Sequence, residues 1–198
     1  MHPDHAVAAP AAGPDRGAPR PFRDLILGLI LDLNTTAKRS FPPIVDGRAV
    51  ALVLGTLPGE ESLRRQQYYA HPRNLFWPIV FTLFGDGAVP DYGARLAFVQ
   101  SSRLALWDVC GLAERVASAD ATIRAELPNE IPALLDAHPG IRIVAFNGAT
   151  ARRLYDRHFE RRPSITYLPL PSTSPAHASL GFAAKLEAWR GLWEAVRG

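Results

Sequence analysis

The stretch that most constrains the fold is an apolar run, Ala49 to Leu54, which ends in a turn built from Gly and Pro. So short and apolar a run is typical of a strand buried on both faces. Gly55 permits a sharp bend directly after it, and Pro58 and Gly59 fix the next bend, because Pro restricts φ and Gly tolerates positive φ. Open α/β sheets bind ligands beside loops at the carboxyl ends of parallel strands. We therefore expect this loop to line a binding site.

Segments with strand and helix character alternate along the rest of the chain. Strands are expected at Arg48–Leu54, Ala105–Val109, Ile141–Phe146 and Ser164–Leu168, and helices at Asn74–Phe84, Tyr92–Gln100, Asn129–His138, Gly148–Phe159 and Ser179–Val196. Such alternation predicts a parallel sheet covered by helices on both faces.

The amino-terminal part differs from the rest in composition. Residues 1–21 are rich in Ala, Pro and Gly and lack a hydrophobic period, which predicts a disordered tail. Residues 22–33 contain an apolar stretch that fits a short helix. We therefore expect an extension at 1–39 and one folded domain at 40–198, a length that can bury a sizeable core.

Composition excludes several classes of protein. The single cysteine, Cys110, rules out a disulfide framework and a four-cysteine iron–sulfur site, and a reducing cytoplasm is the expected compartment. We expect no metal, because no His, Cys and Asp spacing suits one, and no membrane span. The net charge is only +3, so the whole molecule is not a strongly basic nucleic-acid binder. All but two of the 22 basic residues are arginine, which suits bidentate phosphate contacts, although a GC-rich genome would give the same bias.

Two motifs carry a family resemblance. Gly55-Thr56-Leu57-Pro58-Gly59, Tyr68-Tyr69-Ala70-His71-Pro72 and Asn74-Leu75-Phe76-Trp77 together resemble the first motif of the uracil-DNA glycosylase superfamily, and specifically its mismatch-specific and hypoxanthine-DNA glycosylase branch. Leu170-Pro171-Ser172-Thr173-Ser174-Pro175-Ala176-His177 resembles the loop that those enzymes push into the DNA duplex. The resemblance implies a three-layer α/β/α fold around a four-stranded, mainly parallel sheet. It also implies a monomer that acts on double-stranded DNA without a cofactor.

The resemblance assigns roles in the first motif. Tyr69 takes the position of the aromatic ring that stacks on an extruded base, although a tyrosine packed in the core is the alternative. Leu57 stands where many members of the superfamily place an Asn or Asp that positions water. The hypoxanthine branch instead relies on a later asparagine, which falls on Asn74 and is expected to be catalytic. Its alternative role is to cap the helix that follows. Gly55 and Leu57 are expected to line the base pocket.

Further candidates follow two other strands. Asn147 directly follows the third expected strand, where its amide can either read the polar edge of a base or cap a helix. Asp108 ends the second strand and is expected either to polarise water or to remain a surface acid. His71 is a secondary candidate that we expect to hold its own loop. Glu60 and Glu61 are expected to be solvated, because carboxylates repel DNA phosphates.

The second motif is expected to contact DNA. Hydroxyl groups and backbone N–H groups bind phosphate oxygens, and flanking prolines stiffen the loop, although an ordinary rigid loop is the alternative. The expected DNA-binding residues are Ser172, Thr173, Ser174, Pro175 and His177.

These features favour a monofunctional glycosylase of base excision repair that removes deaminated bases, with hypoxanthine as the first choice. A uracil or mismatch-specific glycosylase is the nearest alternative. Two alternatives without catalysis are a damage-binding protein and an α/β module that binds a nucleotide phosphate in the Gly55–Gly59 turn. That turn lacks a P-loop lysine and the spacing of a dinucleotide fingerprint. A lyase is disfavoured because neither motif contains a lysine.

Overall fold

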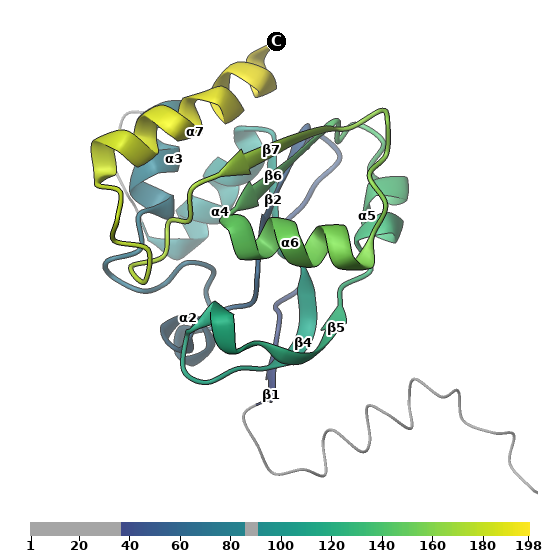
Figure 1. Cartoon of the computed structure of the whole chain (residues 1–198). Coiled ribbons are helices and arrows are strands. Elements are labelled where there is room, and N and C mark those ends of the chain that lie inside the picture. Colours follow the sequence, from purple (N-terminus) through teal and green to yellow (C-terminus); the bar gives the residue numbers. More distant parts are fainter. Residues whose placement is uncertain (1–36, 86–90) are drawn as a thin grey trace, which may run out of the picture. The chain divides into compact units, whose positions relative to one another are not determined.

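Four parallel strands form the central sheet in the computed structural model, which describes residues 37–85 and 91–198 (Figure 1). The strands are β2 (Ala51–Gly55), β3 (Leu104–Asp108), β6 (Ile143–Asn147) and β7 (Thr166–Leu170), in the order β3-β2-β6-β7. Each overlaps its expected range, so the predicted parallel sheet is confirmed. The register pairs Gly55 with Asp108, so polar and flexible residues at the strand ends lie at one edge of the sheet.

The two faces of the sheet bury separate apolar clusters. In β2, Leu52 and Leu54 pack into one cluster, whereas Ala51 and Val53 pack into the other. This follows from the pleat of a strand, which points successive side chains to opposite faces. Because the side chains on both faces are apolar, each face of the sheet must be covered, which explains the continuous apolar run in the sequence.

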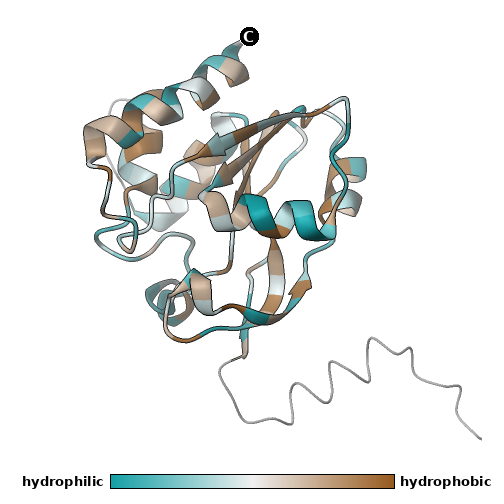
Figure 2. Ribbon diagram, in the orientation of Figure 1, coloured by the Kyte–Doolittle hydropathy of each residue, from teal (hydrophilic) through white to brown (hydrophobic). Residues whose placement is uncertain are grey.

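Helices cover both faces, which confirms the expected three-layer arrangement. The first cluster includes side chains from α5 (Ile131–Ala137) and α6 (Ala149–His158). The second includes side chains from α3 (Phe76–Phe84), α4 (Tyr92–Ser101) and α7 (Phe182–Arg197). Hydrophobic residues gather on the strands, and the outer side of α6 is hydrophilic (Figure 2). Within the described ranges, no helix has both the length and the apolar character needed to cross a membrane.

A small antiparallel sheet beside the main one was not predicted. It contains β1 (Ala37–Arg39), β4 (Cys110–Glu114) and β5 (Arg124–Pro128), in the order β1-β4-β5. Only Val109 separates the end of β3 from the start of β4, so the sequence shows a single apolar segment where the structure has two strands. The turn η1 (Asp120–Thr122) and the six-residue helix α2 (Glu60–Arg65) were also missed, because both are too short for a hydrophobic period to mark them.

The expected amino-terminal extension lies almost entirely outside the described residues. The tail at 1–21 and the short helix at 22–33 are both in the part that the structure does not describe. The boundary at residue 39 remains a prediction. β1 lies just on the extension side of that boundary and pairs with β4.

Trp189 on α7 tests how the closing helix contributes to stability. Its side chain is fully buried, and its Nε1 donates a hydrogen bond to the Pro171 carbonyl at 3.0 Å. We expect Trp189→Ala to lower the free energy of unfolding by about 3–5 kcal/mol, because it leaves a large cavity. Urea denaturation monitored by circular dichroism measures this. Phe182→Ala on the same helix is the matched control, since Phe182 is 39% exposed and its loss should cost far less.

Candidate active site

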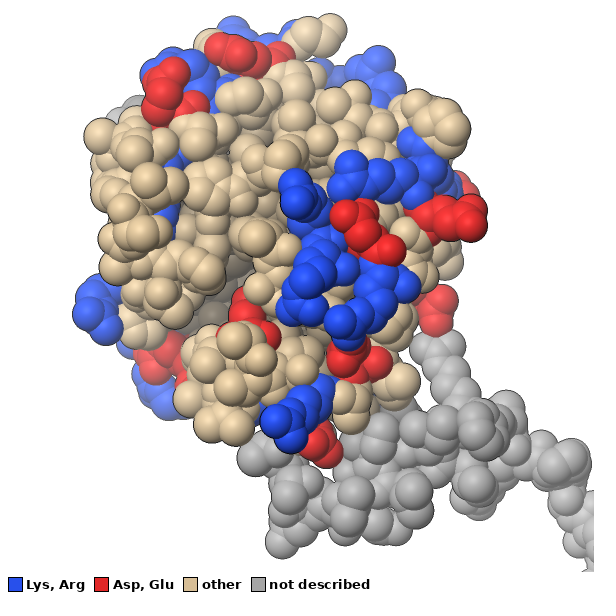
Figure 3. Space-filling model, viewed as in Figure 1, with Lys and Arg blue, Asp and Glu red and all other residues tan. Residues whose placement is uncertain are grey.

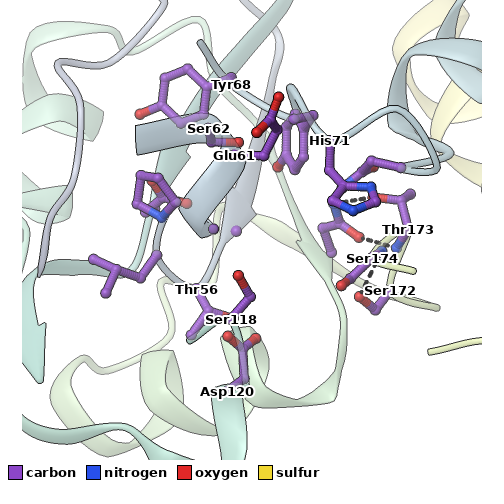
Figure 4. Close-up of a pocket in the computed structure, with 18 of the residues that line it drawn as sticks. Thr56, Glu61, Ser62, Tyr68, His71, Ser118, Asp120, Ser172, Thr173 and Ser174 are labelled. Atoms are coloured by element: carbon purple, nitrogen blue, oxygen red, sulfur yellow. Dashed lines mark hydrogen bonds between the residues drawn. The ribbon is translucent and has the colours of Figure 1, made fainter. Parts of the chain in front are cut away.

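The two sequence motifs meet at one cavity of about 110 Å³ at the carboxyl edge of the central sheet. Its lining includes the expected residues Gly55, Leu57, Tyr69, His71, Asn74, Asp108, Asn147, Ser172, Thr173, Ser174 and Pro175. In Figure 4, His71 lies beside the Ser172–Ser174 loop, and Ser118 and Asp120 form another part of the wall. Segments more than 100 residues apart in the chain therefore share one concave surface, because the strands that precede them end at the same edge.

Thr173 joins the second motif to the first motif and to β6. Its carbonyl accepts a hydrogen bond from Leu75 N–H at 3.0 Å. Its own N–H donates to Asn147 Oδ1 at 2.8 Å, and its Oγ1 accepts from Asn147 Nδ2 at 2.9 Å. Thr173 is fully buried. It therefore fixes the loop, while its serine neighbours remain partly exposed.

Asn147 is thus engaged with the protein before any ligand enters. Both ends of its amide bind Thr173. An amide nitrogen carries two hydrogens, so one donor remains for a base. The next residue, Gly148, has φ of 110°, and a Cβ there would lie 3.0 Å from Ser172 Cβ. Residues 147 and 148 therefore hold the second motif close against the strand end.

Asn74 stands one position before Leu75, the N-cap of α3, and its side chain bonds to the start of this helix. Its Oδ1 accepts a hydrogen bond from Phe76 N–H at 2.9 Å, which satisfies a free donor at the start of α3. The residue is partly exposed and lines the cavity, so Nδ2 can still hold a water or a base. Asn74 is therefore not the N-cap itself, but its bond to Phe76 supports the start of α3, and this is compatible with the catalytic role, which remains a prediction.

Tyr69 lies with its ring stacked on Phe76, with centroids 3.9 Å apart and planes 20° apart. Its backbone adopts φ of 55°, an uncommon conformation for a residue with a bulky side chain. The hydroxyl oxygen is buried, and no described residue meets it in full hydrogen-bond geometry. Burial, and then the nearby Asp108, raise the pKa of this hydroxyl, although the nearby Asn147 amide lowers it. Tyr68 is instead structural, with its hydroxyl donating to the Phe41 carbonyl at 3.3 Å.

Asp108 is a buried group and not a surface acid, so one of its two expected alternatives is wrong. It is 3% exposed, and its Oδ2 accepts a hydrogen bond from Ser40 Oγ at 3.0 Å. Burial is the main cause that raises the pKa of Asp108 to about 7. The carboxyl group fits only because residue 55 is glycine. A Cβ on Gly55 would lie 2.5 Å from Asp108 Oδ1 and 3.3 Å from the Tyr69 hydroxyl.

Arg115 supports the Gly55–Gly59 turn and was not predicted. Its guanidinium group is almost fully buried and donates to the carbonyls of Leu57, at 2.9 Å, and of Pro58. It also pairs with Asp120 at 3.1 Å. Buried charges require such partners. The sequence shows only an arginine after a strand, and nothing local reveals that its partners lie 57 and 58 residues earlier.

The remaining candidates lie at the edges of the cavity. Leu57 is buried in its wall, and His71 Nδ1 accepts a hydrogen bond from Arg73 N–H at 3.1 Å, as expected of a residue that holds its own loop. The Glu60 side chain is 56% exposed and pairs with Lys38. Hydrogen bonds from Arg64 and Arg65 lower the pKa of Glu61 to about 2, so it stays ionised.

His177 is not brought to this cavity. It is exposed and lines a neighbouring hollow that also includes Arg152 and Lys185. Lys185 Nζ donates to the His177 carbonyl at 2.7 Å, and burial lowers the pKa of this lysine. The expected contact between His177 and DNA remains a prediction. Among the described residues, no cluster of three or more His, Cys, Asp or Glu side chains is placed to hold a metal ion.

Comparisons with known proteins identify the family. The family model described as the uracil DNA glycosylase superfamily matches residues 42–193. A protein named hypoxanthine DNA glycosylase from Methanosarcina barkeri is 37% identical over 112 residues, which are 56% of this chain and 71% of the relative. A protein of the same name from Methanosarcina acetivorans is 37% identical over 115 residues, or 58% of this chain and 73% of the relative.

A solved structure agrees with these matches. The solution NMR structure of a candidate uracil DNA glycosylase from Methanosarcina acetivorans has a TM-score of 0.69 and is 30% identical. The likeness covers 82% of this chain and 99% of that one. The expected family is therefore confirmed, and the chain belongs to the uracil DNA glycosylase superfamily, in the branch of its two hypoxanthine DNA glycosylase relatives.

Proposed function

We propose that this protein is a monofunctional DNA glycosylase that hydrolyses the N-glycosidic bond of hypoxanthine in double-stranded DNA. The observation that carries the proposal is that Asn74, Tyr69 and the Ser172–Ser174 loop line one cavity, where a hydrogen bond from Leu75 N–H to the Thr173 carbonyl joins the two motifs. The two relatives that are 37% identical over 112 and 115 residues are named hypoxanthine DNA glycosylase. Among the described residues that line the cavity there is no lysine, which favours hydrolysis over Schiff-base chemistry.

The cavity is suited to hold a base that has left the duplex. Glycosylases rotate the target nucleotide out of the stack and bind the free base in a pocket. When the bond to the sugar breaks, the base gains negative charge, and fixed hydrogen-bond donors stabilise that charge. The second amide hydrogen of Asn147 and the buried hydroxyl of Tyr69 are donors of this kind. We assign them to the base.

We assign the positioning of the attacking water to Asn74. Leu57 is apolar and buried, so it cannot orient water in the way that a polar residue in the turn would. Asn74 lines the same cavity with an amide that both donates and accepts, and its helix-capping bond fixes its orientation. Positioning of a water by one rigid side chain accelerates hydrolysis because the reacting atoms no longer need to be brought together in solution.

The Ser172–Pro175 loop and the surface beside it are suited to the DNA backbone. The loop is held by Thr173 and by the hydrogen bond from Trp189 to Pro171, so it can enter a duplex without collapsing. Arginine side chains gather over α6 beside the hollow face of the molecule, with acidic side chains among them (Figure 3). Arg152 and Arg153 lie on this helix. Guanidinium groups bind phosphates bidentately, so we propose that α6 contacts the DNA backbone beside the extruded nucleotide. We also propose that the protein acts on DNA as a monomer.

A panel of oligonucleotide duplexes tests the function. Each duplex carries one deoxyinosine, deoxyuridine or deoxyxanthosine, and alkali cleaves the strand wherever the base has been removed. We expect release of hypoxanthine to be at least about tenfold faster than release of uracil, because Leu57 lacks the polar group that uracil enzymes use. Faster uracil release would support the uracil alternative. Tight binding to the inosine duplex with no strand cleavage would identify a damage-binding protein instead.

Two substitutions at Asn74 separate catalysis from helix capping. We expect Asn74→Ala to slow hypoxanthine release by about 10²–10³-fold while the affinity for the inosine duplex is retained. Asn74→Asp preserves the oxygen that caps α3 but removes both amide hydrogens. Single-turnover rates and fluorescence anisotropy measure the two effects. If Asn74→Ala keeps full activity, residue 74 has no catalytic role.

A further inference from the structure

The inner end of the cavity is formed by a carboxyl group that lies against the backbone. Asp108 pairs with Gly55 in the register of β3 and β2. Ser40 Oγ holds Oδ2, and Oδ1 lies 2.5 Å from the point that a Cβ on Gly55 would occupy. Because Gly55 has no side chain, nothing from residue 55 separates Oδ1 from a molecule in the cavity.

The hydroxyl of Tyr69 converges on the same point. It lies 3.3 Å from the Cβ position of Gly55, and no group within residues 37–85 and 91–198 meets it in full hydrogen-bond geometry, although the Asn147 amide is close enough to lower its pKa. Buried hydroxyls in folded proteins normally have a partner. A carboxyl oxygen and this hydroxyl therefore point to one place where a polar atom of a ligand would bind both.

The burial of Asp108 indicates which part of a nucleotide would lie between its Oδ1 and the Tyr69 hydroxyl. Asp108 is 3% exposed, whereas Asn74, Ser172 and Pro175 are partly exposed and lie nearer the mouth. An extruded nucleotide remains joined to the DNA through its sugar, so the base enters deepest. Asp108 therefore faces the base, and the water that attacks the sugar lies nearer to Asn74.

We propose that Asp108 is a catalytic residue that donates a proton to the departing base. The proposal rests on the proposed function. The bond between C1′ and the base nitrogen breaks, and its electron pair moves to the base. The proton on Asp108 Oδ1 passes to an acceptor atom of the base, while a water adds to C1′ and releases a proton to solvent. Asp108 regains a proton from solvent after the base leaves.

The groups around Asp108 keep it able to hold that proton near neutral pH. Burial raises the pKa of its carboxyl to about 7, the hydrogen bond from Ser40 and the charge of Arg115 lower this pKa, and Asp120 raises it. The remaining titratable groups that face it are Tyr68, Tyr69 and Cys110, and burial raises the pKa of each, so they are neutral at pH 7. A proton donor is most effective when its pKa is close to the working pH.

The pH dependence of excision tests the proposal. We expect the single-turnover rate on an inosine duplex to fall about tenfold per pH unit above pH 7, because only the protonated carboxyl donates. Asp108→Asn should be about 10²–10⁴-fold slower and should lose this dependence on pH. Asp136→Asn, at an exposed carboxylate paired with Arg162, is the matched control and should keep the wild-type rate and profile.

Ser40→Ala is a second variant, and it is expected to shift the pH midpoint of the rate profile rather than to abolish the dependence on pH. The Ser40 hydrogen bond favours the charged carboxylate, so its removal should raise the pKa of Asp108 and move the midpoint of the rate profile to higher pH. A merely structural role for Asp108 would change the rate and leave the midpoint in place. This variant also keeps the proposal testable if Asp108→Asn does not fold.

The outcomes separate this proposal from the proposed function. Excision by the wild type, with a slow and pH-independent Asp108→Asn variant, supports the donor role. Excision by the wild type with an unchanged Asp108→Asn rate, or an unmoved midpoint in Ser40→Ala, overturns the donor role alone. A wild type that removes no base from any duplex of the panel overturns the proposed function and, with it, the donor role.

Discussion

The hydrogen bonds around Thr173 are the interaction on which the site depends. Thr173 uses its N–H and its hydroxyl to bind Asn147, and its carbonyl to bind Leu75. Through these contacts one buried residue fixes the second motif to the end of β6 and to the start of α3. Each partner would be a free polar group at the end of a secondary-structure element without Thr173, and buried free polar groups are costly. The cavity therefore has a fixed shape before it meets DNA.

The site separates buried polar groups from partly exposed ones. Asp108 and the Tyr69 hydroxyl lie at the inner end, supported by the stacking of Tyr69 on Phe76 and by the packing of Arg115 under the Gly55–Gly59 turn. Asn74 and the serine hydroxyls lie closer to solvent. In a buried setting, each hydrogen bond has a larger electrostatic effect than in water. The base would contact the buried groups of Asp108 and Tyr69, and the DNA backbone would contact the partly exposed serine hydroxyls.

Much of the fold was predictable from the sequence because the central strands are apolar on both faces. β2 is fully buried, and its sequence is an unbroken apolar run. The small antiparallel sheet was not predictable in this way. β5 is exposed or only partly buried, and its pairing with β4 includes irregular register, so its sequence carries no regular alternation. A hydrophobic period in the sequence reveals a helix or strand only when one of its faces is buried.

The candidate site was predictable to the extent that its residues are neighbours in sequence. Tyr69 and Asn74 were found because they belong to one motif. The burial of Asp108 and the support from Arg115 depend on contacts across 68 and 58 residues, which no local pattern records. The capping bond of Asn74 was foreseen as an alternative to catalysis, but the structure shows that one side chain can serve the helix and face the cavity together.

The two lysines are both withdrawn from the surface. Lys38 pairs with Glu60, with a side chain that is only 11% exposed, and Lys185 is buried against the His177 carbonyl. The positive charge available on the outside of the described domain is thus carried by guanidinium groups. Acylating and cross-linking reagents that react with side-chain amines would leave that charge unaltered. Amine coupling to a solid support would likewise have few attachment points on the described domain.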